Sequence, residues 1–158
     1  MEPGHSARAV RLGGLLFQAH SVARRAANDV LRDLGLELRD LGVLELLAGA
    51  QDWTQQQLGE RLGIDKSAMV RIVDALERAG LVSRRRRGDD RRAYSVTVTG
   101  AGREAMAAAY SRVAAAMDEL LVGFSDAERE TLGELLERIV RRAAETRSRD
   151  GRPGGQPL

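Results

Sequence analysis

The sequence contains no cysteine, which excludes a disulfide framework, a thiolate zinc site and a cysteine-based redox sensor. It contains only two histidines, so we expect no metal site, and we expect no cofactor. Aromatic residues make up only 3% of the 158 residues, so the core must come from Leu, Val, Ile and Ala. Because alanine and leucine favour helices, this composition indicates a mainly α-helical protein.

Long hydrophobic runs are missing as well. No apolar stretch approaches the ~18 residues that a membrane-spanning helix needs. The first residues include Glu2 and lack the hydrophobic core of a signal peptide. We therefore expect a soluble, cytoplasmic protein without a membrane partner.

The net charge is only +2, but the positive charge is concentrated in one segment. Residues 61–92 contain ten Lys or Arg and five Asp or Glu, whereas the rest of the chain contains 15 basic and 18 acidic residues. Such a local excess is typical of a nucleic-acid-binding surface, although a solvated basic loop has the same composition. Charge alone therefore does not decide between these two interpretations.

Four helices are predicted up to residue 80. Apolar residues at helical spacing indicate a long helix over residues 6–34 and a second over residues 38–48. A capping box formed by Thr54 and Gln57 opens a short third helix, which ends near Gly63. Asp65 caps a fourth helix over residues 66–79. The last two helices, joined by a tight turn, form a helix-turn-helix.

A β-hairpin is predicted after this motif, because the apolar period changes to two. Residues 81–87 form its first strand, residues 88–90 supply turn residues, and residues 94–98 alternate as its second strand. Trp53 is predicted to close the edge of the small sheet. The hairpin is a basic wing whose six arginines are too many to bury, so we expect them to face water or phosphate: Arg84, Arg85, Arg86, Arg87, Arg91 and Arg92. Arginines at a hairpin tip suit a narrow minor groove.

Two more amphipathic helices are predicted at the C-terminal end. Thr99 caps a helix over residues 100–121, and a capping box of Ser125 and Glu128 opens one that runs to about Thr146. Long apolar stripes at both ends of the chain need a surface to cover, and a second copy is the simplest one. The alternative is that these helices fold back on their own module. The expected organisation is an N-terminal dimerisation helix (1–35), a winged helix-turn-helix module (36–99), C-terminal dimerisation helices (100–146) and a disordered tail (147–158).

The fourth helix has two distinct faces. Met69, Ile72, Val73 and Leu76 fall on one side of a helical wheel, which we expect to pack on the preceding helix. Four residues fall opposite, where they can enter a major groove: Ser67, Arg71, Asp74 and Arg78. Arg71 can donate two hydrogen bonds to guanine, and Val70 on the flank can touch a thymine methyl group. We expect Lys66 to bind phosphate and Asp74 to orient Arg71 or Arg78.

These stretches resemble the MarR family of regulators. The matching segments are residues 54–67, residues 76–82 and, most specifically, residues 90–99, which are similar to the family's D-x-R-x-x-x-V-x-L-T wing. The resemblance implies a homodimer that binds a pseudo-palindromic site in double-stranded DNA, with Arg92 in the minor groove. It also implies repression that a small, often anionic aromatic, ligand relieves. The chain departs from the family pattern at Val70, where Thr is frequent, and over residues 36–40, where L-T-x-x-Q is frequent.

The predicted function is therefore that of a sequence-specific, DNA-binding transcriptional repressor. No catalytic constellation is present, so we do not expect an enzyme. The alternative function is a winged-helix module that binds another protein. The candidate DNA-binding residues are Gln55, Gln56, Lys66, Ser67, Ala68, Val70, Arg71, Arg84, Arg86, Arg87, Asp90, Arg91 and Arg92. The family analogy places a ligand pocket at Phe17, His20, Arg24, Asp40 and Leu44; for His20 a half-buried position at the base of a dimer is the alternative.

Overall fold

The computed structural model describes the backbone of residues 3–49, 52–87 and 90–149. Side chains are described for the same residues except 3–5, 86–87, 90–93, 144 and 147–149. In chain order the elements are α1 (Pro3–Leu31), η1 (Arg32–Leu34), α2 (Leu38–Ala48), β1 (Trp53–Thr54), α3 (Gln55–Leu62), α4 (Lys66–Arg78), β2 (Val82–Arg87), β3 (Asp90–Val98), α5 (Gly100–Leu120) and α6 (Asp126–Arg149). The mainly α-helical fold with a small wing is confirmed.

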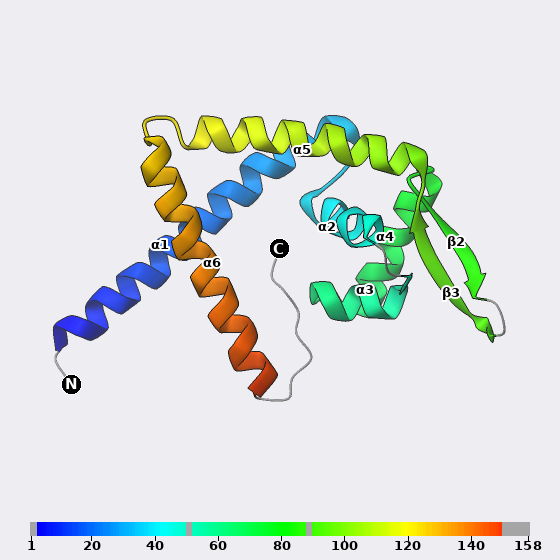
Figure 1. Cartoon of the computed structure of the whole chain (residues 1–158), viewed down its shortest axis with the longest axis horizontal. Helices are drawn as coiled ribbons and strands as arrows, with labels where there is room; N and C mark the ends of the chain where they lie inside the picture. Colours follow the sequence, from blue (N-terminus) through cyan, green and yellow to red (C-terminus); the bar gives the residue numbers. More distant parts are fainter. Residues whose placement is uncertain (1–2, 50–51, 88–89, 150–158) are drawn as a thin grey trace.

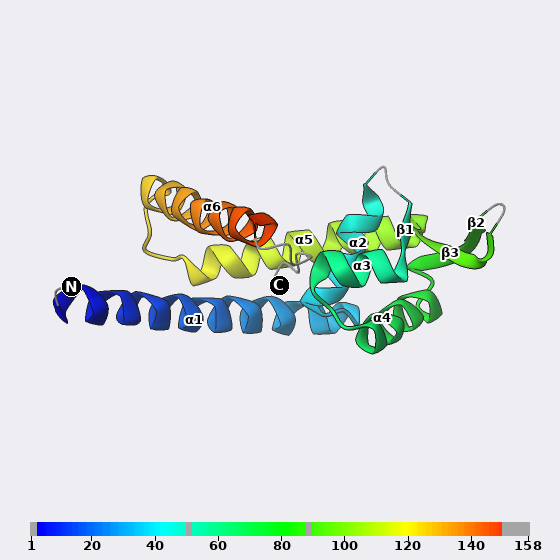
Figure 2. The same cartoon turned by 90° about the horizontal axis from the view of Figure 1, so that it is seen from below.

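The elements form two parts, a group of short helices with the hairpin and a set of long helices that extend from it. Figure 1 shows α2, α3, α4 and the hairpin gathered at one end of α5, whereas α6 follows from its other end and α1 runs obliquely away from its middle. α1 packs against α5. The helices α1 and α6 cross in Figure 1, but Figure 2 separates them, so α6 projects away from the rest of the chain. Among the described residues, no helix has the length and apolarity to cross a membrane.

The core lies between the helix-turn-helix and the helices that support it. Leu58 of α3, Val73 of α4 and Val43 and Leu44 of α2 are completely buried. Leu31 of α1 and Ala109 of α5 join the same cluster, which therefore anchors both long helices to α2, α3 and α4. We call residues 38–98, from α2 to β3, the helix-turn-helix module.

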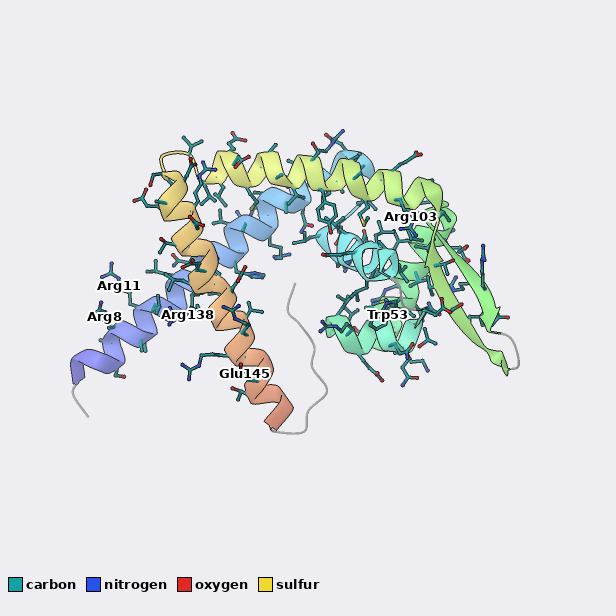
Figure 3. The ribbon with its side chains drawn as sticks, in the orientation of Figure 1. Arg8, Arg11, Trp53, Arg103, Arg138 and Glu145 are labelled. Atoms are coloured by element: carbon teal, nitrogen blue, oxygen red, sulfur yellow. The ribbon has the colours of Figure 1, made fainter. Side chains whose placement is uncertain are left out.

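The sheet is small and antiparallel, with the strand order β1-β3-β2. Val82 pairs with Val98 at the base of the hairpin, and the register shifts between Arg86 and Arg87. Trp53 in β1 pairs with Val96 of β3, which confirms the prediction that Trp53 closes the edge of the sheet. Figure 3 shows Trp53 beside α3, far from the charged ends of α1 and α6.

Local capping explains why α3, α4 and α6 begin where the sequence predicted. The Thr54 hydroxyl accepts from the backbone N–H of Gln57, whose side chain accepts from the N–H of Thr54, so the capping box is present. The Asp65 carboxylate accepts from the N–H of Ala68 at 2.9 Å. Ser125 and Glu128 form the capping box that opens α6.

A tight junction joins α5 to the end of α4. The Thr99 hydroxyl accepts from the N–H of Gly102 and lies 2.7 Å from the carbonyl oxygen of Gly80, to which it donates. A Cβ atom on Gly102 would lie 2.1 Å from the carbonyl oxygen of Leu81, so only glycine fits at this point of α5. The junction fixes the direction of α5 relative to α4, the second helix of the helix-turn-helix, which we call the recognition helix.

Some predicted boundaries were wrong. α1 begins at Pro3 rather than Ser6, and residues 32–34 form a 3-10 turn rather than a continuation of the α-helix. α6 continues through residues 147–149, which had been assigned to a disordered tail; residues 150–158 lie outside the described part. The helix extends because nothing in residues 147–149 (Arg, Ser, Arg) stops it, whereas Gly and Pro begin further on.

Candidate nucleic-acid interface

α4 presents a polar face because its apolar face is fully used by the core. Met69, Ile72, Val73 and Leu76 are all at most 5% exposed, as the helical wheel predicted. Ser67, Arg71 and Arg78 are exposed on the other side, and Val70 is 37% exposed on the flank. We call the surface formed by Ser67, Val70, Arg71 and Arg78 the outer face of α4.

The start of α4 is fixed by hydrogen bonds that also orient Ser67. The Ser67 hydroxyl donates to Oδ1 of Asp65 at 2.7 Å. This bond, with the N–H of Ala68, lowers the pKa of Asp65 below its ordinary value. Because its proton is used, the Ser67 oxygen is left as an acceptor, suited to an amino group on a base edge or to a donor such as water.

Arg71 stands beside a hollow of about 430 Å³ between α4 and the loop before α2. Ala68, Arg39 and Asp40 line the same hollow. Burial raises the pKa of Asp40, although the hydrogen bond from the N–H of Glu37 at 2.7 Å opposes this shift. Among the described side chains none forms an ion pair with Arg71, so its guanidinium is available to a ligand.

A second hollow, of about 630 Å³, lies between the beginning of α3 and the turn before α4. Three predicted site residues line it: Gln55, Gln56 and Lys66. The Gln56 side chain donates to Glu60 at 2.9 Å and is therefore engaged within α3. The Gln55 side-chain nitrogen is buried and has no partner in the described part of the chain. Lys66 is exposed at the edge of this hollow.

The wing carries the remaining predicted residues. Arg85 is exposed, and the backbones of Arg86, Arg87, Asp90, Arg91 and Arg92 lie in β2 and β3. The side chains of these last five residues lie outside the described part, as do Gly88 and Asp89 of the predicted turn. The hairpin itself is confirmed.

Arg84 corrects the expectation that all six wing arginines face water or phosphate. Its side chain is only 22% exposed and forms ion pairs with Asp74 and Glu77 of α4. The same contact corrects the role predicted for Asp74, whose carboxylate binds Arg84 rather than Arg71 or Arg78. Burial opposes the charge of Arg84, but the hydrogen bonds to Asp74 and Glu77 outweigh it and raise the pKa of Arg84.

The five residues predicted for a ligand pocket are not brought together in one cavity of the described chain. Phe17, His20 and Arg24 are exposed along α1, so His20 is not half-buried within the single chain. Leu44 is completely buried in the core, and Asp40 lines the hollow beside Arg71. Phe17 and Leu44 therefore cannot line one pocket in the single chain, because Phe17 is open to solvent and Leu44 is enclosed by the core.

Sequence reasoning missed the pairing of Glu77 with Arg84 and the position of Arg39, which lines the same hollow as Arg71. Glu77 and Arg84 lie seven residues apart across the turn between α4 and β2. Opposite charges flanking a helix–strand turn are a usable signal for such a pair. For Arg39 no signal was available, because its place in this hollow depends on how the fold arranges α2 relative to α4.

The helix-turn-helix, the antiparallel hairpin and the exposed outer face of α4 together define a winged helix-turn-helix protein. Among the described residues, no group of three His, Asp or Glu side chains is arranged to hold a metal ion.

The sequence model of the MarR family matches residues 34–93. The putative transcriptional regulatory protein for the hcr operon of Thauera aromatica is 32% identical over 143 residues, which cover 90% of this chain and 86% of that protein. CouR from Rhodococcus jostii RHA1, solved with p-coumaroyl-CoA, is 32% identical with a TM-score of 0.66, over 81% of this chain and 90% of that one. The MarR family protein Rv2887 of Mycobacterium tuberculosis, solved with DNA, is 25% identical with a TM-score of 0.70, over 81% of this chain and 96% of that one. The chain belongs to the MarR family.

Proposed function

We propose that this protein is a transcriptional repressor that binds a pseudo-palindromic site in double-stranded DNA as a homodimer. The observation that carries the proposal is the outer face of α4, where Ser67 and Arg71 are exposed because the opposite face is buried. The complex of Rv2887 with DNA and the assignment of the Thauera relative to an operon support it. Such a regulator works in the cytoplasm and needs no enzymatic activity.

The proposal gives the two reading elements different tasks. Arg71 donates to guanine in the major groove, and Val70 contacts a thymine methyl group. The sugar-phosphate backbone of the DNA lies against a further set of residues: Gln55, Gln56, Lys66 and Ala68. The wing, through Arg92 with Arg86, Arg87, Asp90 and Arg91, follows the adjacent minor groove, where the potential is most negative.

The dimer is proposed from side chains that the single chain leaves uncovered. Leu135, Leu136, Ile139 and Val140 of α6 are 43–52% exposed, and Phe17 and Leu15 of α1 are exposed as well. An apolar surface of this kind on two long terminal helices is typical of an interface between subunits. The proposed dimerisation segments are residues 1–35 and 100–146, and the module between them reads the DNA.

A small-molecule effector belongs to the proposal because CouR was solved with p-coumaroyl-CoA. We assign no residues to its site, since the five predicted ones do not form a cavity in the single chain. An effector would shift the repressor between two arrangements of its helix-turn-helix modules only if it bound one of them more tightly.

The test is binding to a duplex from the protein's own promoter, measured over a range of salt concentrations. Specific retention with a steep negative slope of log affinity against log salt is expected. Arg71→Ala should weaken binding by roughly 5- to 150-fold and relax the preference at one base pair. Arg141→Ala, which removes an exposed cation from α6 outside the module, is the control; at a protein concentration where it and the wild type are both fully dimeric, it should bind like the wild type.

Two outcomes would overturn the proposal. Equal affinity for every duplex would show that the protein does not read sequence. Unchanged DNA binding by Arg71→Ala, with an acidic protein partner captured through the wing, would favour a protein-binding winged-helix module instead.

A further inference from the structure

The guanidinium of Arg84 is bound to carboxylates of α4, whereas an arginine that contacts DNA needs a free guanidinium. It lies in β2 at the base of the wing, and its two terminal nitrogens go to different carboxylates of α4: Nη1 to Glu77 and Nη2 to Asp74. The backbone N–H of Arg84 also donates to Glu77 at 3.0 Å. One residue of the wing is therefore fixed to the recognition helix at three points.

The two carboxylates lie next to the proposed reading surface. Asp74 is one helical turn beyond Arg71, and its side chain is 48% exposed; that of Glu77 is 37% exposed. The Arg78 side chain donates to the backbone carbonyl of Asp74 at 3.3 Å rather than to its carboxylate. In the described part of the chain, Arg84 is thus the cation that neutralises Asp74 and Glu77.

Without that cation the recognition helix would present two negative charges close to the DNA phosphates. Like charges brought together in an interface oppose binding, and the effect is strongest at low salt. A phosphate would also have to compete with two carboxylates for the nitrogens of Arg84, so a direct contact with DNA is disfavoured by the same geometry.

We propose that Arg84 is a positioning residue for DNA reading, which neutralises Asp74 and Glu77 and holds the wing at a fixed angle to α4 without contacting DNA. This inference rests on the proposed function. It also explains why arginine stands here: a guanidinium can reach two carboxylates with separate nitrogens in a rigid plane, whereas a lysine ammonium is a single point charge.

The experiment compares the effect of Arg84→Met in two backgrounds, with the same promoter duplex and folding checked by thermal unfolding. In the wild-type background, Arg84→Met should weaken binding about tenfold or more, because two carboxylates are uncovered. In the Asp74→Asn, Glu77→Gln background, the same change should cost less than about threefold, because there is no charge left to neutralise. Arg84→Lys should fall between wild type and Arg84→Met.

The salt slope gives a second readout that a merely structural role would not change. The triple variant Arg84→Met, Asp74→Asn, Glu77→Gln should keep the wild-type slope. If Arg84 contacted a phosphate, that slope would fall by about 0.9. An equal loss of affinity in both backgrounds, or this fall in slope, would overturn the inference.

Failure of the proposed function and failure of the role of Arg84 give different results. A wild-type protein that binds no duplex sequence-specifically contradicts the proposed function. A wild type that binds specifically while Arg84→Met binds equally well contradicts only the role of Arg84. If Arg84→Met does not fold, the triple variant is compared with Asp74→Asn, Glu77→Gln, and a loss of about tenfold in that pair contradicts the inference.

Discussion

The helix-turn-helix module and the terminal helices use apolar residues in opposite ways. In α3 and α4 the apolar side chains that face the core are buried to within a few per cent, as at Leu58 and Met69, and Val70 on the flank of α4 is the exposed exception among the large ones. In α6 comparable side chains, such as Leu136 and Ile139, remain more than 40% exposed. The module therefore completes its core within one chain, whereas α6 needs a surface that the chain itself does not supply.

This contrast separates two sources of stability. Burial of apolar area contributes about 25 cal/mol per Å² whether the partner is the same chain or another. The contribution of the module is present at any protein concentration, but that of an intersubunit surface depends on concentration.

The largest effect is expected for Leu58→Ala. This completely buried side chain fills the centre of the module, so its truncation should lower the free energy of unfolding by about 2–5 kcal/mol. Urea denaturation at several protein concentrations measures it. Leu135→Ala, at a 48% exposed position of α6, is the control; its effect should shrink as the protein is diluted. Equal, concentration-independent losses would remove the distinction between the two regions.

The next effect concerns the surface of α6. Ile139→Glu, at a 47% exposed position, should weaken dimerisation by at least about 2 kcal/mol, roughly thirtyfold, because a carboxylate would be buried in the interface. Sedimentation velocity measures the dissociation constant. Glu137→Lys, on the same helix, is a control for a change of charge. A wild type that is monomeric at all concentrations would contradict the assigned role of α6.

The junction between the two regions can be tested at a pair of glycines. Gly102→Ala should lower the free energy of unfolding by about 1–3 kcal/mol, because the added methyl group meets the carbonyl oxygen of Leu81. Gly100→Ala is the matched control, since nothing lies within 4 Å of its added Cβ atom. Thermal unfolding compares the two. If both variants have the wild-type melting temperature, the close approach of α5 to Leu81 is not tight.

The smallest effect is electrostatic and depends on pH. Burial raises the pKa of Asp40 in the folded state, so the stability linked to this group is greatest below the unfolded pKa of about 3.9 and is lost as the pH rises through the folded pKa. Asp40→Asn, which keeps an acceptor for Glu37, should therefore gain stability relative to wild type near neutral pH. The gain should disappear in acid. A gain of the same size at both pH values would point to packing rather than charge.

Most of the secondary structure could be predicted because its signals are local. The starts of α3, α4, α5 and α6 are each set by a capping residue whose partner lies three residues away. The buried face of α4 follows from helical periodicity alone, and all four of its predicted core residues are buried. The candidate reading residues Ser67 and Arg71 were placed correctly on the exposed side for the same reason.

The predictions that failed depend on contacts between distant segments. Arg84 was expected to face phosphate because a run of arginines cannot be buried, but β2 leaves α4 at an angle that brings this one side chain to Asp74 and Glu77. The ligand pocket was assembled from α1 and α2 by analogy. In the structure Leu44 belongs to the core, while Phe17 is 72% exposed on α1.

The sequence by itself thus determined where most of the helices and strands lie and which face of the recognition helix is apolar, because caps and periodicity act within a few residues. Only the tertiary structure decided which charged side chains neutralise one another and which apolar side chains stay uncovered. Both depend on the directions in which packed helices and strands leave one another, and Thr99 and Gly102 fix one such direction at a single close contact.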